Sequence, residues 1–143
     1  MPRPRSDDKR NRILDAATRV IATQGLSAPT MGIAKEAGIA NGSLFTYFET
    51  KSELFNQLYL ELKQEMAAVA MWDFPAEAEL REQFSHISRN WGNWAVRFPE
   101  KRKALAQLAV SGEITQGTRA AGHKIMTAIA GLLERVRVDC PRR

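Results

Sequence analysis

The stretch TMGIAKEAGIANGSLFTYFETKSEL, residues 30–54, decides the fold because it sets two short helical patterns on either side of a glycine. Three apolar residues of the first pattern share one face of a helix. They are Ile33, Ala34 and Ala37. Thr30 can cap the start of this helix, and Gly38 tolerates the left-handed backbone angles at which the helix must stop. The stretch therefore predicts a helix, a tight turn and a second helix.

The second pattern divides its residues between a buried face and an open face. Leu44 and Phe48 lie four residues apart and form the buried face. Most of the remaining positions are small, polar or hydroxyl-bearing. They are Asn41, Gly42, Ser43, Phe45, Thr46 and Tyr47. Such a surface can approach base edges and phosphates closely, so the layout is typical of a helix-turn-helix that enters a groove of DNA.

The spacing of these residues resembles the helix-turn-helix of the TetR family of bacterial transcriptional regulators. The positions that carry the resemblance are Thr30, Ile33, Ala34, Ala37, Gly38, Ile39, Gly42, Leu44, Phe45, Tyr47, Phe48, Lys51, Leu54 and Phe55. It covers roughly the first 55 residues closely, whereas the rest resembles the family in being helical with aromatic faces. The resemblance implies an all-α protein with a three-helix DNA-binding domain, residues 1–50, and a helical ligand-sensing and dimerisation domain, residues 51–143. This second domain is shorter than is usual for the family.

The resemblance also implies which side chains contact DNA. Thr46 and Tyr47 stand where the family contacts bases and phosphates. Lys51 offers a charge and free backbone N–H groups at the start of the next helix, and Thr30 offers N–H groups at its own helix start. Three further positions of the second helix suit base edges or close backbone approach. They are Asn41, Gly42 and Ser43.

Two residues depart from the family pattern. Ala40 stands where a capping serine is usual, which should weaken the start of the second helix by about 1 kcal/mol unless Asn41 takes over the capping role. Phe45 stands where tyrosine is usual and cannot donate a hydrogen bond to phosphate. It either meets a thymine methyl group or simply packs.

Helical patterns occupy the rest of the chain. Residues 7–24 carry one apolar face, end at Gly25, and should brace the two helices of the motif. Thr50 and Glu53 form a T-x-x-E capping box, so a long helix should start at Lys51 and run to Pro75. Three more helices are expected, and no strand pattern appears. They cover residues 76–98, 100–110 and about 117–138. In the family, the tilt of the helix after the motif transmits ligand binding to the DNA-binding helices.

Aromatic residues gather in the second half of the chain, where they predict an apolar effector site. The candidate ligand-binding residues are Trp72, Phe84, Trp91, Trp94 and Phe98. An aromatic-lined cavity between helices is a usual site for an apolar small molecule, and core packing is the alternative for each ring. His86 and His123 lack an organised carboxylate or thiol partner in the sequence, so neither a metal site nor a cofactor is expected.

Composition limits the remaining possibilities. The net charge of +5 and the pI near 9.7 are compatible with a polyanionic partner. Basic residues crowd the N-terminus, where a flexible arm could lie in a neighbouring groove and a solvated tail is the alternative. They are Arg3, Arg5, Lys9, Arg10 and Arg12. Cys140 is the single cysteine, and no apolar run approaches the roughly 20 residues that span a bilayer. These features favour the cytoplasm and give no sign of a membrane segment.

Together these observations predict a DNA-binding transcriptional regulator, a ligand-responsive repressor that binds a palindromic operator as a homodimer and responds to a small hydrophobic effector. A ligand-independent or truncated DNA-binding protein is the alternative. A small helical enzyme is less favoured, because no nucleophile and base stand at a known spacing. The last helix could pair with its twin. The residues that would form this contact are Ile125, Ile129, Leu132 and Val136.

Overall fold

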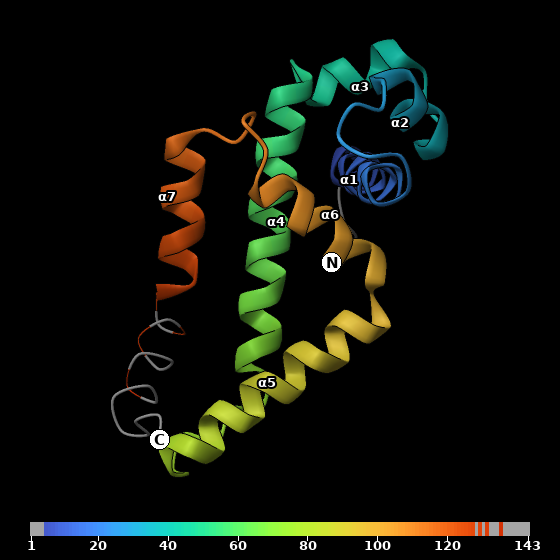
Figure 1. The fold of residues 1–143 in the computed structure, drawn as a ribbon. Helices are drawn as coiled ribbons and strands as arrows, with labels where there is room; N and C mark the ends of the chain where they lie inside the picture. Colours follow the sequence, from blue (N-terminus) through green and yellow to red (C-terminus); the bar gives the residue numbers. More distant parts are fainter. Residues whose placement is uncertain (1–4, 128, 130, 132–134, 136–143) are drawn as a thin grey trace. The chain divides into compact units, whose positions relative to one another are not determined.

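The computed structural model describes residues 5–127, 129, 131 and 135, and helix is the only regular secondary structure among them. The seven helices are α1 (Arg5–Gln24), α2 (Thr30–Ala37), α3 (Asn41–Tyr47), α4 (Lys51–Met71), α5 (Leu80–Arg97), α6 (Pro99–Ala109) and α7 (Gln116–Ile125) (Figure 1). The prediction of an all-α fold is confirmed for this part of the chain. None of its helices combines the length and apolar character that crossing a membrane requires.

The helices form two compact units, and each unit takes two separate segments of the chain. The first unit comprises residues 1–59 and 100–115, and the second comprises residues 60–99 and 116–143. The sequence pattern places a boundary at residue 50, where the motif ends. Packing instead adds the start of α4, all but the first residue of α6 and the segment after α6 to the first unit.

In the first unit, α1 braces the helix-turn-helix as the sequence predicts. Its apolar face is buried. The buried residues are Ile13, Leu14, Ala16, Ala17, Val20 and Ile21. The Arg19 guanidinium meets the Glu36 carboxylate of α2 at 2.9 Å, an exposed pair that fixes orientation more than it stabilises. Gly25 ends α1 with φ of +88°, and its N–H donates to Ile21 O at 2.9 Å.

The turn between α2 and α3 depends on Gly38, which adopts φ of +76°. Its N–H donates to Lys35 O at 3.1 Å, and the next N–H, of Ile39, reaches Ala34 O at 3.0 Å. These two bonds satisfy the last carbonyls of α2 and reverse the chain. The predicted cap at the other end is wrong. Pro29 occupies the N-cap position without a side-chain hydrogen bond, and Thr30 is already the first helical residue.

The start of α3 also lacks a side-chain cap, as the sequence predicts. Ala40 is the N-cap residue and makes no side-chain hydrogen bond. Asn41 does not take over this role, since its Oδ1 atom is buried and has no hydrogen-bond partner among the described residues. The Ser43 N–H reaches Ala40 O at 3.0 Å, and the N–H groups that precede it in α3 are left for solvent or a ligand.

Replacing Ala40 with serine is expected to stabilise the first unit by about 1 kcal/mol, because the new hydroxyl can accept a hydrogen bond from the first turn of α3. Urea unfolding followed by circular dichroism would measure the change. Ala106→Ser, at an exposed position inside α6, is the control and should destabilise slightly, since serine is a poorer helix former than alanine. Equal shifts in both variants would contradict the uncapped start.

The capping box at the start of α4 is confirmed, with one change of partner. The Glu53 N–H donates to Thr50 Oγ1 at 3.0 Å, while the Glu53 carboxylate accepts the N–H of Glu49, not that of Thr50, at 2.8 Å. Both bonds satisfy backbone groups that would otherwise lack partners. They fix the angle at which the chain enters α4 directly after the DNA-binding motif.

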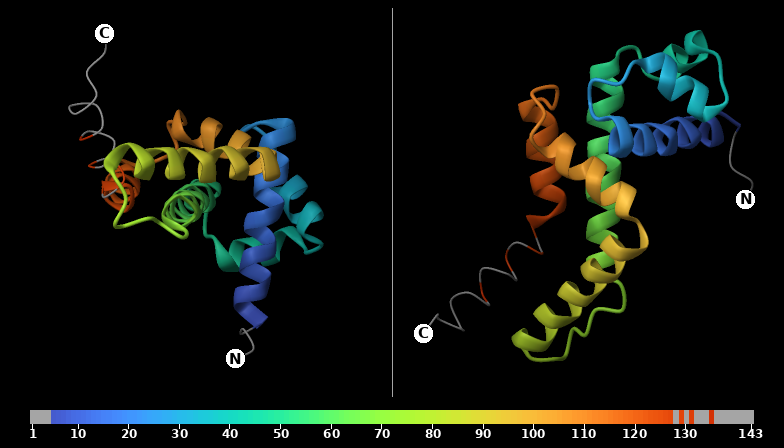
Figure 2. Two further views of the ribbon diagram at one scale, coloured as in Figure 1. Left: turned by 90° about the horizontal axis from the view of Figure 1, so that it is seen from below. Right: turned by 45° about the vertical axis from the view of Figure 1, so that its right-hand side comes forward.

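Helix α6 and the segment that follows it attach to the first unit through side-chain amides. Gln107 Nε2 donates to Ile21 O of α1 at 3.0 Å, and Figure 2 shows α6 beside α1. Asn56 of α4 grips the chain after α6 with both ends of its amide: Nδ2 donates to Glu113 O at 2.8 Å, and Oδ1 accepts from Thr115 N–H at 3.0 Å. Four apolar side chains of this segment are buried. They are Ala104, Leu105, Leu108 and Ile114.

The second unit has a small core drawn from three segments. Ala70 of α4, Ile87 of α5 and Ile129 form its buried centre. Five partly buried side chains pack around them. They are Ala67, Phe74, Leu80, Trp91 and Met126. Because Ile129 is 2% exposed within its own chain, it cannot offer that side chain to a twin helix as the sequence suggests. The expected contacts of Leu132 and Val136 lie outside the described residues.

Two helix boundaries in the second unit differ from the sequence prediction. α5 begins at Leu80 and not at residue 76, because Pro75 starts a turn in which Ala78 N–H reaches Pro75 O at 3.0 Å. Gln83 Nε2 holds this turn by donating to Pro75 O at 3.1 Å and to Ala76 O at 3.2 Å. α7 ends at Ile125 and Met126 forms a turn, whereas the described residues beyond it, 127, 129, 131 and 135, are again helical. The helix expected to residue 138 is therefore interrupted at Met126.

Candidate nucleic-acid interface

The face of α3 opposite the core is the candidate interface. Leu44 and Phe48 are 0% and 1% exposed, so they anchor the helix in the first unit. Four other residues of α3 are exposed to solvent. They are Gly42, Ser43, Phe45 and Thr46. A Cβ atom placed on Gly42 would meet no other atom within 4 Å, which leaves the approach to the helix backbone open.

Asn41 and Tyr47, at the two ends of α3, are only partly accessible. Both side chains are half-buried. The buried Oδ1 atom of Asn41 restricts its amide to one usable end, whereas the sequence suggests a full base-edge contact. Tyr47 keeps part of its side chain in solvent at the last helical residue.

Lys51 follows directly, at the first position of α4. Its Nζ atom lies 5.5 Å from the centre of the Phe55 ring, one turn along the same helix. The ammonium thus lies beside the first turn of α4, where the backbone N–H groups and the helix dipole also favour an anion. Thr30 is half-buried at the corresponding first position of α2. The structure thus gathers every candidate DNA residue of the sequence in the first unit.

Arg10 has a role that the sequence did not indicate. The pattern groups it with a flexible basic arm, but α1 begins at Arg5, so Lys9, Arg10 and Arg12 lie on a helix. Arg10 Nη2 donates to Gln57 Oε1 at 2.8 Å, and its guanidinium carbon lies 5.8 Å from the centre of the Phe48 ring. Arg10 therefore joins α1 to the end of α3 and to α4. Arg3 lies outside the described residues.

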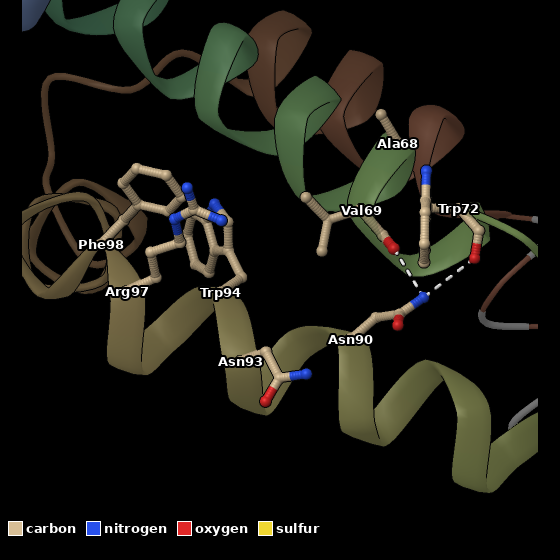
Figure 3. Close-up of a pocket in the computed structure, with 8 residues that line it drawn as sticks. All are labelled: Ala68, Val69, Trp72, Asn90, Asn93, Trp94, Arg97 and Phe98. Carbon is tan, nitrogen blue, oxygen red and sulfur yellow. Dashed lines mark hydrogen bonds between the residues drawn. The ribbon is translucent and has the colours of Figure 1, made fainter.

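A separate groove occurs in the second unit, with a volume of about 490 Å³. α4 and α5 line it (Figure 3). The lining residues are Ala68, Val69, Trp72, Asn90, Asn93, Trp94, Arg97 and Phe98. Three of the five aromatic residues proposed from the sequence are among them. The structure places Phe84 and Trp91 outside the groove, because Trp91 packs against the core and Phe84 is an exposed residue of α5.

Hydrogen bonds hold the walls of this groove in place. Asn90 Nδ2 donates to Val69 O at 2.9 Å and to Trp72 O at 3.2 Å, which fastens α5 to the end of α4 (Figure 3). Trp94 is buried, and its Nε1–H donates to Glu65 Oε2 at 2.7 Å. The Trp72 side chain is 70% exposed and remains available at the rim. The groove is therefore a fixed apolar surface with one accessible indole.

The histidines take structural or exposed positions. His86 Nε2 lies 2.7 Å from Trp72 O, and the His86 ring meets Phe74 edge-on with ring centres 6.4 Å apart. His123 is exposed on α7. Among the described residues, no three histidine, cysteine, aspartate or glutamate side chains gather in a way that could hold a metal ion.

Comparison with known proteins finds a family match in the first unit. The family model described as bacterial regulatory proteins, tetR family, matches residues 13–58. This range runs from the buried face of α1 to the first two turns of α4 and includes all of α2 and α3. It therefore contains all the candidate DNA residues described above.

Individual relatives and solved structures agree with this match. The chain is 34% identical over 89 residues to the HTH-type transcriptional regulator AcrR of Shigella flexneri, a match that covers 57% of this chain and 41% of AcrR. A crystal structure of a tetR family transcription regulator from Shewanella sp. PV-4 is similar with a TM-score of 0.81 and 29% identity, over 92% of this chain and 71% of that one. A TetR family regulator from Marinobacter aquaeolei VT8 shares the fold with a TM-score of 0.85 at 22% identity, over 94% and 71% of the two chains.

These matches differ in extent. The chain spans less than half the length of the curated relatives it matches, between 32% and 45%. The structural matches cover 92% and 94% of the chain and carry the likeness beyond the helix-turn-helix. Residues 13–58 match the TetR family of bacterial regulatory proteins, and the chain is similar in fold to TetR-family regulators over most of its length.

Proposed function

We propose that this chain is a DNA-binding transcriptional regulator, a repressor that binds a palindromic operator as a homodimer in the cytoplasm. The observation that carries the proposal is α3, which buries Leu44 and Phe48 and leaves Gly42, Ser43, Phe45 and Thr46 exposed. Such a helix can enter the major groove while its buried face holds it on the domain. Lys51 and the start of α4 then lie next in sequence to bind a phosphate. TetR-family proteins are transcriptional regulators, which is not an enzyme class, and we propose no catalytic role.

The test is sedimentation of the purified chain with labelled duplexes selected from random DNA at near-physiological salt. The proposal expects two chains on one palindromic site and strong preference for that site over unrelated DNA, because paired recognition helices contact half-sites about one helical turn apart. Weak, sequence-independent and salt-sensitive binding would contradict a regulator of specific genes. One chain on each selected site would contradict only the homodimer, and DNA binding would stand.

The proposal extends to a small apolar effector in the groove of the second unit. Support comes from the groove volume of about 490 Å³, which falls within the range of small-molecule sites, and from its aromatic lining. Effector binding would change DNA affinity only if the effector prefers one of two conformations of the chain. An effector that lowers the affinity of the protein for the operator should release the operator. Operator binding should lower the affinity of the protein for the effector by the same factor.

Trp72→Ala is expected to weaken binding of an apolar fluorescent probe, anilinonaphthalene sulfonate, about fivefold without changing the urea midpoint. The exposed indole can contact a ligand, but the core does not need it. Val96→Ala removes an exposed apolar side chain of α5 outside the groove and should leave probe binding unchanged. Trp91→Ala should lower the urea midpoint, because the ring packs on the core and its Nε1–H donates to Met66 O at 3.0 Å. Unchanged probe affinity in Trp72→Ala would exclude the groove as the probe site.

A further inference from the structure

The exposed face of α3 has unusual chemistry for a helix expected to read DNA. The helix has no acidic residue in its first turn and no basic residue in its last, and its sequence NGSLFTY contains no charged side chain. Arginine, lysine, glutamine, aspartate and glutamate commonly form direct hydrogen bonds with base edges in the major groove. α3 contains none of them. The amide of Asn41 is the one remaining group in α3 that could bind a base through two hydrogen bonds.

The burial of Asn41 limits even this contact. Recognition of adenine by an asparagine uses both ends of the amide, one as acceptor and one as donor. In this structure Oδ1 is buried and lacks a partner among the described residues. Turning the amide over would bury the nitrogen instead. In either orientation one end of the amide faces the protein, so Asn41 cannot make the paired contact from this position.

Two exposed side chains in the middle of α3 present apolar surface. Phe45 is 38% exposed and lies outside the face that buries Leu44 and Phe48. The neighbouring Thr46 is exposed, and its hydroxyl is directed at Gly42 O of its own helix at 3.5 Å. With the hydroxyl hydrogen directed at the backbone, the Thr46 side chain offers a ligand its methyl group and the acceptor lone pairs of Oγ1.

The open space at Gly42 completes this surface. Gly42 precedes Phe45 and Thr46 by three and four residues, so the three share one side of the helix. No atom lies within 4 Å of the point where a Cβ of residue 42 would stand. A base edge can thus approach close to the helix beside the ring and the methyl group.

The apolar feature of a base pair in the major groove is the C5-methyl group of thymine, and phenylalanine and the threonine methyl are among the groups that contact it. We propose that Phe45 and Thr46, beside the open position at Gly42, recognise C5-methylated pyrimidines in the operator. This inference rests on the proposed DNA-binding function and states which chemical group of the DNA the recognition helix selects. Thymine and 5-methylcytosine share that group, and the test separates them.

The test uses the full chain and the duplex selected from random DNA. Each thymine of one half-site is replaced in turn by deoxyuridine, which removes only the C5-methyl group and keeps every hydrogen bond. One or two positions should lose about fivefold in affinity, the value expected for one buried methyl group. At these positions a cytosine–guanine pair should bind more tightly when the cytosine carries a 5-methyl group. The remaining thymines of the same duplex are the internal control.

Variants of the protein connect the effect to the side chain. Phe45→Ala should reduce the ratio of thymine to uracil affinity at one position to about one, whereas Phe45→Leu, which keeps an apolar side chain, should retain a ratio above two. Val110→Ala, a change at an exposed apolar residue of the first unit outside the candidate interface, should leave the ratio unchanged. Selective binding that tolerates uracil at every thymine would overturn the inference and leave the proposed function intact. The same thymine-to-uracil ratio in Phe45→Ala would also overturn it. Failure to select any duplex would overturn the proposed function together with the inference.

Discussion

Leu44→Ala is expected to destabilise the first unit by about 3 kcal/mol and to abolish sequence-selective DNA binding near 37 °C. Leu44 is fully buried and is the only residue within α3 that is buried, with Phe48 capping its end. Truncation leaves a cavity whose surroundings can relax only in part, which costs about 2–5 kcal/mol for leucine. A loss of this size is a large share of the stability of a small unit. Urea unfolding monitored by circular dichroism would measure it.

Phe45→Ala is the matched control, because it removes a larger side chain from the next residue of the same helix. Since Phe45 is 38% exposed, its loss should change the free energy of unfolding by less than about 1 kcal/mol. Leu44→Met, which keeps the volume, should restore most of the stability. Similar destabilisation in Leu44→Ala and Phe45→Ala would show that both faces of α3 are packed, and the candidate interface would then be wrong.

Lys51→Ala is expected to weaken DNA binding by about 1.5 kcal/mol per chain, and so about 100-fold for a dimer, because each chain loses one charged phosphate contact. The loss should be similar for selected and unrelated duplexes, since phosphate contacts carry no sequence information. The slope of log affinity against log salt should fall by about 0.9 per chain. Titrations at several salt concentrations would measure both quantities.

Lys124→Ala removes the same charge from α7 of the second unit and should leave the slope nearly unchanged. Lys51→Arg should restore the slope, because the slope depends on charge. If Lys51→Ala and Lys124→Ala change the slope equally, the effect is one of net charge, and the position of Lys51 at the start of α4 has no special role in binding phosphate.

The sequence predicts the DNA-binding motif well where the determining chemistry is local. The left-handed backbone at Gly38 and the capping box of Thr50 and Glu53 depend on residues within four positions, and both are confirmed. The prediction that Thr30 caps α2 is wrong, and the reason is also local. Pro29 has the fixed φ angle that the residue before a helix can adopt, so α2 includes Thr30 one position earlier than the capping pattern suggests.

Contacts between distant residues could not be predicted in this way. No local pattern indicates that Gln107 reaches the last turn of α1, 86 residues earlier, or that Arg10 lies over Phe48. The aromatic residues show the same limit. Trp91 and Trp94 are three residues apart in one helical pattern, yet only Trp94 lines the groove, because helix rotation decides which side each ring faces. The DNA contacts and the effector site remain predictions that the experiments above address.

The return of residues 100–115 to the first unit has a consequence for how the protein is made. Gln107, Leu108 and Ile114 complete packing that begins with α1, so a ribosome must synthesise the intervening α5 before the DNA-binding unit can close. At typical synthesis rates of about 5–20 residues per second, the nascent helix-turn-helix waits several seconds for its last partners. A protease or a premature stop acting between α4 and α6 would thus leave a recognition helix whose supporting unit is unfinished.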